Sequence, residues 1–207
     1  MARKDESFDS ITDVDGPLEE LTFIEACGFM YTDYLLQHTA AANRIDELAD
    51  GAQIIAVRSA WVVNNAFATE LLMKSLHMLD HGFWKKGHSL KSLYGSLRQD
   101  TRDRARKLFE AYLQMRPSLR ESAESIDEAI EMNDRSFELW RYGPERIHDV
   151  GSFEHVVGLP EVFSSIILER RQDWQRHYSF ALEAVRRAGW IDEVGDTQIC
   201  PDVIGDM

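Results

Sequence analysis

One helix that is apolar in nearly every direction constrains what this chain can fold into. The helix is expected over about residues 52–81, where apolar residues occupy most sides of a helical wheel. Four of its charged and histidine side chains fall within roughly 60° of one another when residues are placed about 100° apart. They are Glu70, Lys74, His77 and His81. Such a helix is central and buried, and buried charges need partners, so this polar stripe marks either a structural network or a functional site.

The remaining helical patterns predict an all-α protein. The expected helices run over about residues 18–49, 52–81, 88–97, 100–116, 119–133 and 160–188, with a loop over 136–157. Asp100-Thr101 can cap the fourth of these helices, and Ser118 with Glu121 has capping-box spacing for the fifth. Pro160 suits the first turn of the last helix. The sequence therefore predicts a bundle built on two long antiparallel helices with shorter helices packed across them.

The domain organisation follows from length and composition. With 207 residues and 44% apolar content, the chain fits a single helical domain over 18–190. We expect a disordered acidic N-terminus over 1–17 and an acidic tail over 191–207. No apolar run approaches the roughly 18 residues of a membrane span, and the N-terminus lacks the apolar segment of a secretory signal. Cys27 and Cys200 lie far apart, as in a reducing compartment. A cytoplasmic protein with no membrane partner is expected.

The charge is distributed unevenly along the chain. The net charge is −13, yet the segment from Lys85 to Lys107 has eight basic and two acidic residues, which gives +6 and leaves −19 elsewhere. Its basic residues are Lys85, Lys86, Lys91, Arg98, Arg102, Arg104, Arg106 and Lys107. This basic segment is either a solvated helix surface balanced by the acidic remainder or a docking surface for RNA or an acidic protein.

The polar stripe and its surroundings contain the candidate site residues. Glu70 and Lys74 have the i, i+4 spacing of a helix ion pair, which on this apolar helix favours a buried network. His77 and His81 share one face, as metal ligands do. However, no clear third ligand accompanies them, so we expect a polar helix end, no metal and no cofactor.

Two further residues can complete the stripe from outside the helix. His88 stands where a loop enters a short helix. It is either a helix-start residue or a proton-transfer group that points back at the stripe. Arg141 lies between Trp140 and Tyr142 in the expected loop. It can pair with Glu70, bind an anion, or tie the loop to the core.

These motifs, taken in order, resemble the HEPN superfamily of small helical-bundle proteins. The relevant branch has a helix with E-x-x-x-K, then G-H-x-L-x-x-L, then an aromatic residue with R-Y and a following Glu. Here these are Glu70 to Lys74, Gly87 to Leu93, and Trp140-Arg141-Tyr142 with Glu145. The resemblance covers about residues 64–145. It implies a homodimeric bundle and, in the family's active members, metal-independent RNA cleavage in toxin–antitoxin or phage-defence systems.

Active members of that superfamily also carry an arginine followed, after four to six residues, by a histidine at the dimer interface. Two pairs here have this spacing, Arg141 with His148 and Arg171 with His177. In one hypothesis, such a pair makes the protein an endoribonuclease. The histidine would transfer a proton at the ribose 2′-hydroxyl, and the arginine would stabilise the charge on the phosphorane.

The other hypothesis is a non-catalytic, dimeric interaction module. Glu70, Lys74, His88 and Arg141 then form a buried polar network. The basic segment docks an acidic partner, either a nucleotidyltransferase-like antitoxin or the chain's own acidic tail. The acidic net charge favours this second hypothesis. The Arg141/His148 pair also does so, because Tyr142 follows the arginine where active members usually have a polar residue.

Overall fold

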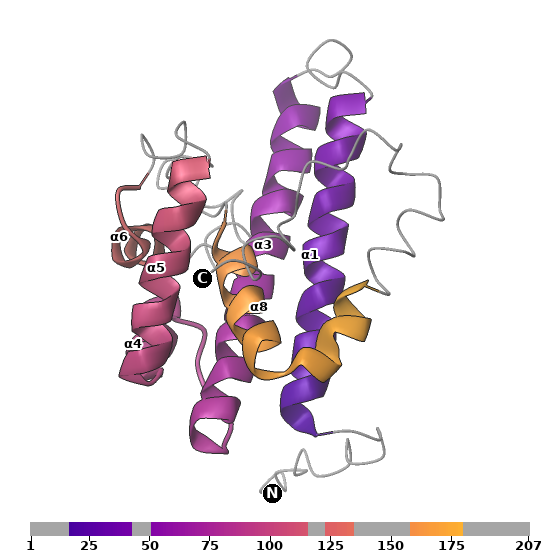
Figure 1. Cartoon of the computed structure of the whole chain (residues 1–207). Helices are drawn as coiled ribbons and strands as arrows, with labels where there is room; N and C mark the ends of the chain where they lie inside the picture. Colours follow the sequence, from indigo (N-terminus) through magenta and orange to yellow (C-terminus); the bar gives the residue numbers. More distant parts are fainter. Residues whose placement is uncertain (1–16, 43–50, 116–122, 135–157, 180–207) are drawn as a thin grey trace, which may run out of the picture.

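The computed structural model describes residues 17–42, 51–115, 123–134 and 158–179, with side chains described in 17–32, 60–115, 123–134 and 158–179. All regular structure in these ranges is helical, which confirms the all-α prediction. The elements are α1 (Leu18–Ala42), α3 (Gly51–His81), α4 (Leu90–Ser96), α5 (Gln99–Met115), α6 (Ile126–Asn133), α8 (Leu159–Arg170) and the 3-10 turn η6 (Gln172–Trp174). Figure 1 shows their arrangement.

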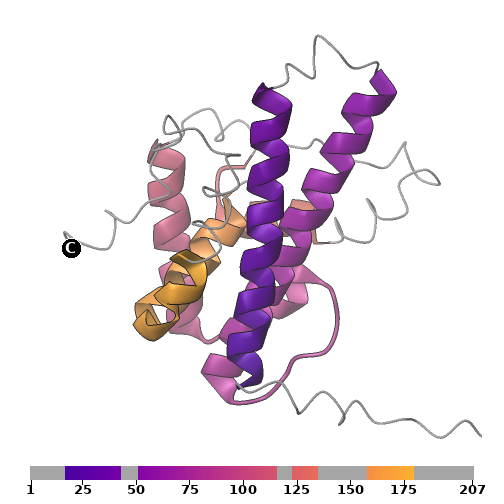
Figure 2. The ribbon, with the colours of Figure 1, turned by 90° about the vertical axis from the view of Figure 1, so that its right-hand side faces the viewer.

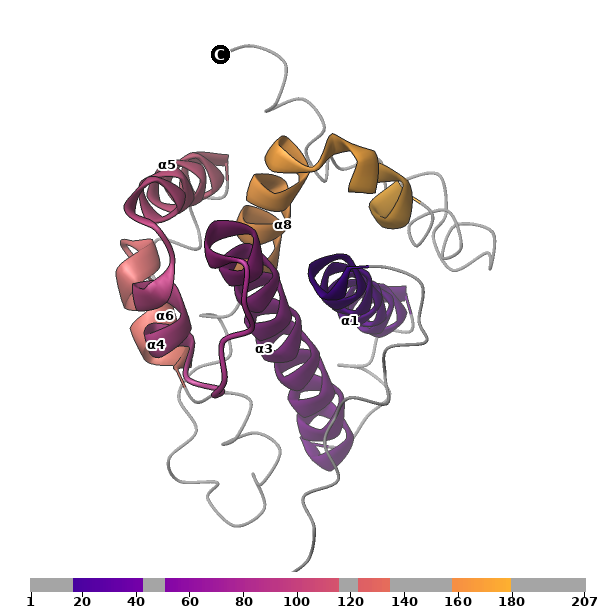
Figure 3. The ribbon, with the colours of Figure 1, turned by 90° about the horizontal axis from the view of Figure 1, so that it is seen from below.

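The two longest described helices, α1 and α3, lie side by side, with 25 and 31 residues. In Figure 1 the chain ascends α1 and descends α3, and Figures 2 and 3 show the same pair from the side and from below. Apolar side chains of α1, including Phe23 and Cys27, are buried. An edge-to-face contact between Phe29 and Phe67, with ring centroids 4.6 Å apart, joins the pair further along.

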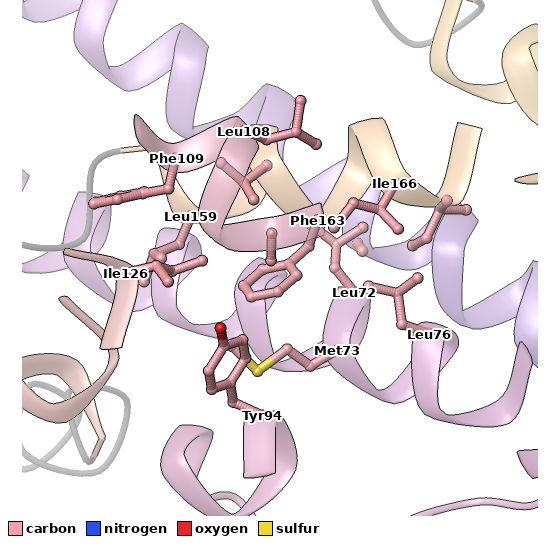
Figure 4. Packing of buried hydrophobic residues seen from close by; sticks show 14 of the residues in the cluster. Leu72, Met73, Leu76, Tyr94, Leu108, Phe109, Ile126, Leu159, Phe163 and Ile166 are labelled. Carbon is pink, nitrogen blue, oxygen red and sulfur yellow. The ribbon is translucent and has the colours of Figure 1, made fainter. Parts of the chain in front are cut away.

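Helix α3 is the centre of the fold, because it contacts α1, α4 and α8. Its side chains Leu72, Met73 and Leu76 are fully buried against Phe163 and Ile166 of α8 (Figure 4). Residues of α4, α5 and α6 close the same core. They include Tyr94, Leu108, Phe109 and Ile126. Burying one such side chain stabilises the fold by about 1.5–3 kcal/mol, so the apolar sides of α3 fix the positions of its polar stripe.

The predicted end of α3 and the turn before α4 are confirmed. The helix stops at His81, and Gly82 follows with φ +78° and its N–H donating to Met78 O at 2.7 Å. Gly87 has φ +105°, a conformation that glycine adopts at little cost. Ser89 then caps α4 by accepting a hydrogen bond from the N–H of Ser92 at 3.0 Å.

One predicted helix cap and one predicted helix start are wrong. Helix α5 begins at Gln99, so Asp100-Thr101 lies inside its first turn. Residues 123–125 precede α6 and are not helical, so the predicted start near 119 is also wrong. There Ser125 accepts from the N–H of Glu128, whose carboxylate accepts from the N–H of Glu124. This pair carries out the capping expected of Ser118 and Glu121, which lie outside the described residues.

The predicted last helix is interrupted. Helix α8 ends at Arg170, and Arg171 has φ −129° and ψ 68°, which no helical residue adopts. The chain continues through η6 into a further helical stretch over 175–179. The break lets Trp174, which is fully buried, stack on Phe23 of α1 at a centroid distance of 5.5 Å. Tertiary packing of one indole ring thus overrides the local helical pattern.

No helix in the described ranges is long and apolar enough to cross a membrane. The predicted loop over 136–157 and the segments over 1–16 and 180–207 lie outside the described residues.

Candidate functional site

The buried end of the candidate site is the carboxylate of Glu70, whose side chain is 1% exposed. Its Oε1 lies 2.6 Å from Nζ of Lys74, one turn further along α3. Nδ1 of His88, from the loop between α3 and α4, lies 3.0 Å from Oε1 and 3.2 Å from Oε2. The structure therefore brings together three of the four residues predicted for the polar network, Glu70, Lys74 and His88.

The donors and acceptors of this network follow from its geometry. An ionised carboxylate can only accept hydrogen bonds, so Nζ of Lys74 donates and Nδ1 of His88 carries the hydrogen that it shares with Glu70. Lys74 is buried like its partner, with a side chain 6% exposed against 1% for Glu70, whereas the His88 side chain is 56% exposed. Trp84 covers Lys74, with Nζ 4.8 Å from the centre of its ring. The network thus ties the loop over residues 82–89 to α3.

Arg141, the fourth predicted member of the network, lies outside the described residues, and so do His148 and the Trp140-Arg141-Tyr142 motif. The described part of the site is an ion pair with a hydrogen-bonded imidazole.

The two histidines at the end of α3 bind backbone carbonyl groups. Nδ1 of His77 lies 3.0 Å from Phe83 O, and Nε2 of His81 lies 2.9 Å from Ser96 O. Because a carbonyl oxygen only accepts, each of these nitrogens carries a hydrogen. Burial lowers the pKa of His77, although its bond to Phe83 O has the opposite effect. Among the described residues, no group of three or more His, Cys, Asp or Glu side chains is placed to hold a metal ion.

A second buried carboxylate, Asp80, escaped the sequence analysis as a site residue. Its side chain is 2% exposed, and Oδ1 lies 2.7 Å from a guanidinium nitrogen of Arg170 on α8. The hydroxyl of Thr101 donates to it at 3.0 Å, and its Oδ2 accepts from the N–H of Arg98 at 2.9 Å. Asp80 therefore holds the start of α5 and the end of α8 to α3. Its position between His77 and His81 was the only local signal, because its partners come from distant segments.

The basic segment is largely neutralised within the molecule. Lys91 pairs with Glu131 at 2.6 Å, Nε of Arg104 lies 3.0 Å from Glu169, and Nε of Arg106 lies 2.9 Å from Asp127. Arg98 approaches Asp100 at 3.8 Å, while Arg102 donates to Gln99 and to Gly95 O. Within the described ranges no carboxylate pairs with Lys85, Lys86 or Lys107. These contacts favour a solvated, self-compensated surface over a docking surface that spans the whole segment.

The structure places Arg171 and His177 on either side of η6, each beside a carboxylate. Arg171 bonds Asp173 through two nitrogens, at 3.0 and 2.7 Å, and its guanidinium carbon lies 4.2 Å from the centre of the Trp174 ring. Nε2 of His177 lies 2.7 Å from Glu20 on α1. The hydrogen bond from His177 lowers the pKa of Glu20, with a smaller contribution from Arg176. Within the single chain, Arg171 and His177 therefore engage separate acidic partners.

Comparison with protein-family models, curated proteins and solved structures finds no match to this chain. Its function has to be argued from the residues and their contacts.

Proposed function

We propose that this protein is a HEPN-like, homodimeric interaction module without catalytic activity. Its two long helices, α1 and α3, would form the antiparallel pair of the HEPN bundle. The resemblance over residues 64–145 is the basis for proposing the family, the homodimer and a role in a toxin–antitoxin or defence-type system. An acidic protein, such as a nucleotidyltransferase-like antitoxin, is the partner that the resemblance suggests.

The observation that supports this proposal most is the network in which His88 bonds to the buried pair of Glu70 and Lys74. Two of the three motifs that resemble the family, E-x-x-x-K and G-H-x-L-x-x-L, meet there, because Nδ1 of His88 lies 3.0 and 3.2 Å from the carboxylate oxygens of Glu70. Lys74 and Glu70 are both buried and compensate each other's charge. Removing one partner from a buried ion pair leaves an uncompensated charge, so both partners of such a pair are needed for the stability of the fold. The network then has a structural role, which is to fix the loop over 82–89.

A metal-independent endoribonuclease is the alternative function. For its Arg171/His177 form, the guanidinium and the imidazole would have to meet RNA, yet Asp173 and Glu20 occupy them. The self-compensated basic segment also offers few free cations for an RNA backbone. Both observations support the non-catalytic proposal over the ribonuclease.

RNA cleavage in EDTA tests this proposal directly. Total RNA is incubated with the purified protein and with the His177→Ala and His148→Ala variants, each checked for folding by circular dichroism. We expect no cleavage by any of the three. Cleavage that disappears in one variant overturns the proposal and identifies the catalytic histidine. Sedimentation equilibrium on the same samples is expected to give a dimer, and a monomer at all concentrations would contradict the HEPN-like assembly.

A further inference from the structure

The loop between α3 and α4 exposes two adjacent aromatic side chains next to two lysines. Phe83 is 60% exposed and Trp84 is 37% exposed, although both are among the largest apolar side chains. Lys86 is exposed beside them and Lys85 is half-buried. Figure 2 shows this loop as a wide curve that stands away from the helices at the edge of the molecule. Exposed large aromatics gathered in one place mark an interaction surface.

The aromatic rings are held in place by α3. The Phe83 ring packs edge-on against the ring of His77, with centroids 5.0 Å apart, and lies 5.9 Å from the ring of His81. The Trp84 ring has the ammonium group of Lys74 over one face. Since these contacts already order both side chains, less conformational entropy is lost when a partner covers their exposed parts.

The loop also lies in a positive part of an acidic chain. No Asp or Glu occurs from His81 to Gln99, a run of 19 residues, whereas the whole chain contains 36 acidic residues. Lys85 and Lys86 have no carboxylate partner within the described ranges. At physiological ionic strength charges are screened over about 8 Å, so the local charge decides what this loop can approach.

We propose that this loop, residues 82–89, docks onto the surface of an anionic lipid bilayer. Phe83 and Trp84 enter the headgroup region, where aromatic side chains are favoured, and Lys85 and Lys86 contact the negatively charged headgroups. The backbone of the loop stays at headgroup depth, where water satisfies its polar groups. The expectation of no membrane partner rested on the lack of a spanning segment, which a surface contact does not need. The inference is independent of the proposed function.

A lipid surface fits this loop better than a nucleic acid does. Binding to a phosphate backbone depends on the number of cations that meet phosphates. Lys91, Arg104 and Arg106, further along the same segment, already pair with Glu131, Glu169 and Asp127. Two free lysines provide few phosphate contacts. Two exposed aromatics provide the apolar area on which interfacial lipid binding depends.

Vesicle flotation tests the proposal on the full chain. The protein is mixed with vesicles of phosphatidylcholine containing 30% phosphatidylserine, as a chosen probe, or of phosphatidylcholine alone. We expect flotation with the anionic vesicles and weaker flotation with the neutral ones. The Lys85→Gln/Lys86→Gln variant is expected to lose binding by up to about 30-fold, at roughly 1 kcal/mol for each lysine. Phe83→Ala is expected to lose roughly fivefold through its apolar area.

Matched controls separate the loop from the general surface. Lys107→Gln removes an exposed lysine on α5, and Met115→Ala removes a side chain that is 56% exposed at the end of α5. Both are expected to float like the unaltered protein, and all variants are first compared by thermal unfolding. Brominated lipid is expected to quench tryptophan fluorescence less in Trp84→Phe than in the unaltered protein.

Three outcomes overturn the proposal. The first is no flotation with anionic vesicles. The second is flotation that persists in both loop variants. The third is binding of a single-stranded oligonucleotide, without vesicle binding, that the double lysine variant abolishes, which would assign the loop to nucleic acid.

Discussion

Two carboxylates on α3, ten residues apart, are equally buried and are satisfied in different ways. Glu70 is 1% exposed and Asp80 is 2% exposed. Glu70 takes its partners from the next turn of its own helix and from the loop that follows, while Asp80 takes Arg170 from 90 residues away. The physical requirement is the same, because a buried charge needs an opposite charge and hydrogen bonds. Only the partners of Glu70, which lie close to it in the chain, can be predicted from sequence spacing.

The largest effect is expected at the local pair. Lys74→Ala leaves the buried carboxylate of Glu70 with His88 alone, so we expect the free energy of unfolding to fall by about 3–5 kcal/mol. Urea denaturation followed by circular dichroism measures this change. Lys107→Ala, at an exposed lysine, serves as the control and is expected to change stability little.

A double variant sharpens the same comparison. Replacing Glu70 and Lys74 together with leucine removes both charges, so the loss of stability should be smaller than for Lys74→Ala alone. A Lys74→Ala protein as stable as the unaltered one would show that Glu70 is not held as a buried charge.

A smaller effect is expected at the distant network. Asp80→Ala removes the hydrogen bonds from Arg98 N–H and the Thr101 hydroxyl as well as the ion pair with Arg170, so we expect a loss of about 2–3 kcal/mol. The loss is smaller than at Lys74 because the side chain of Arg170 is 31% exposed and water can solvate it. A double-mutant cycle with Arg170→Ala measures the coupling, expected at about 0.5–3 kcal/mol. Purely additive effects would mean that α3 and α8 are held by apolar packing alone.

The sequence predicted the local half of this molecule. Helical periodicity gave the all-α class and the end of α3 at His81, and the i, i+4 spacing of Glu70 and Lys74 identified their pair. The position of His88 beside the polar stripe could also be predicted, because only a short loop separates His88 from the end of α3. Each of these features is determined by residues within about twenty positions of one another.

The remaining features depend on contacts between distant segments. The break at Arg171 is explained by the packing of Trp174 on Phe23, which are 151 residues apart. Likewise, no spacing rule links Asp80 to Arg170 or the basic segment to its acidic partners. The Ser125 cap was missed for a different reason, since Ser118 offered the same motif seven residues earlier.

A pH-dependent effect is expected at the contact between Glu20 and His177. The pKa of Glu20 lies below its ordinary value of 4.5 in the folded protein, so its contribution to stability is full above about pH 4.5 and is lost as the pH falls through the lowered pKa. We therefore expect Glu20→Gln to lower the melting temperature at pH 6, and the difference to shrink well below pH 4.5. Thermal melts at a series of pH values test this, with Glu25→Gln, an exposed glutamate of α1, as the control. A difference that stays constant with pH would contradict the pairing.

The smallest effect is expected within the basic segment, where ion pairs are exposed. Nζ of Lys91 lies 2.6 Å from Oε1 of Glu131, the same distance as in the buried pair of Lys74 and Glu70, but the side chains of Lys91 and Glu131 are 62% and 68% exposed. Water and salt screen such a pair, and ordering two long side chains has an entropic cost. We expect Lys91→Gln to leave the melting temperature unchanged in 0.15 M salt, in contrast to Lys74→Ala, although both ion pairs have the same N–O distance. A large loss at Lys91 would show that distance outweighs burial in setting the strength of these pairs. An unchanged melting temperature would show that burial makes the ion pair in the polar stripe of α3 stronger than the exposed pairs of the basic segment.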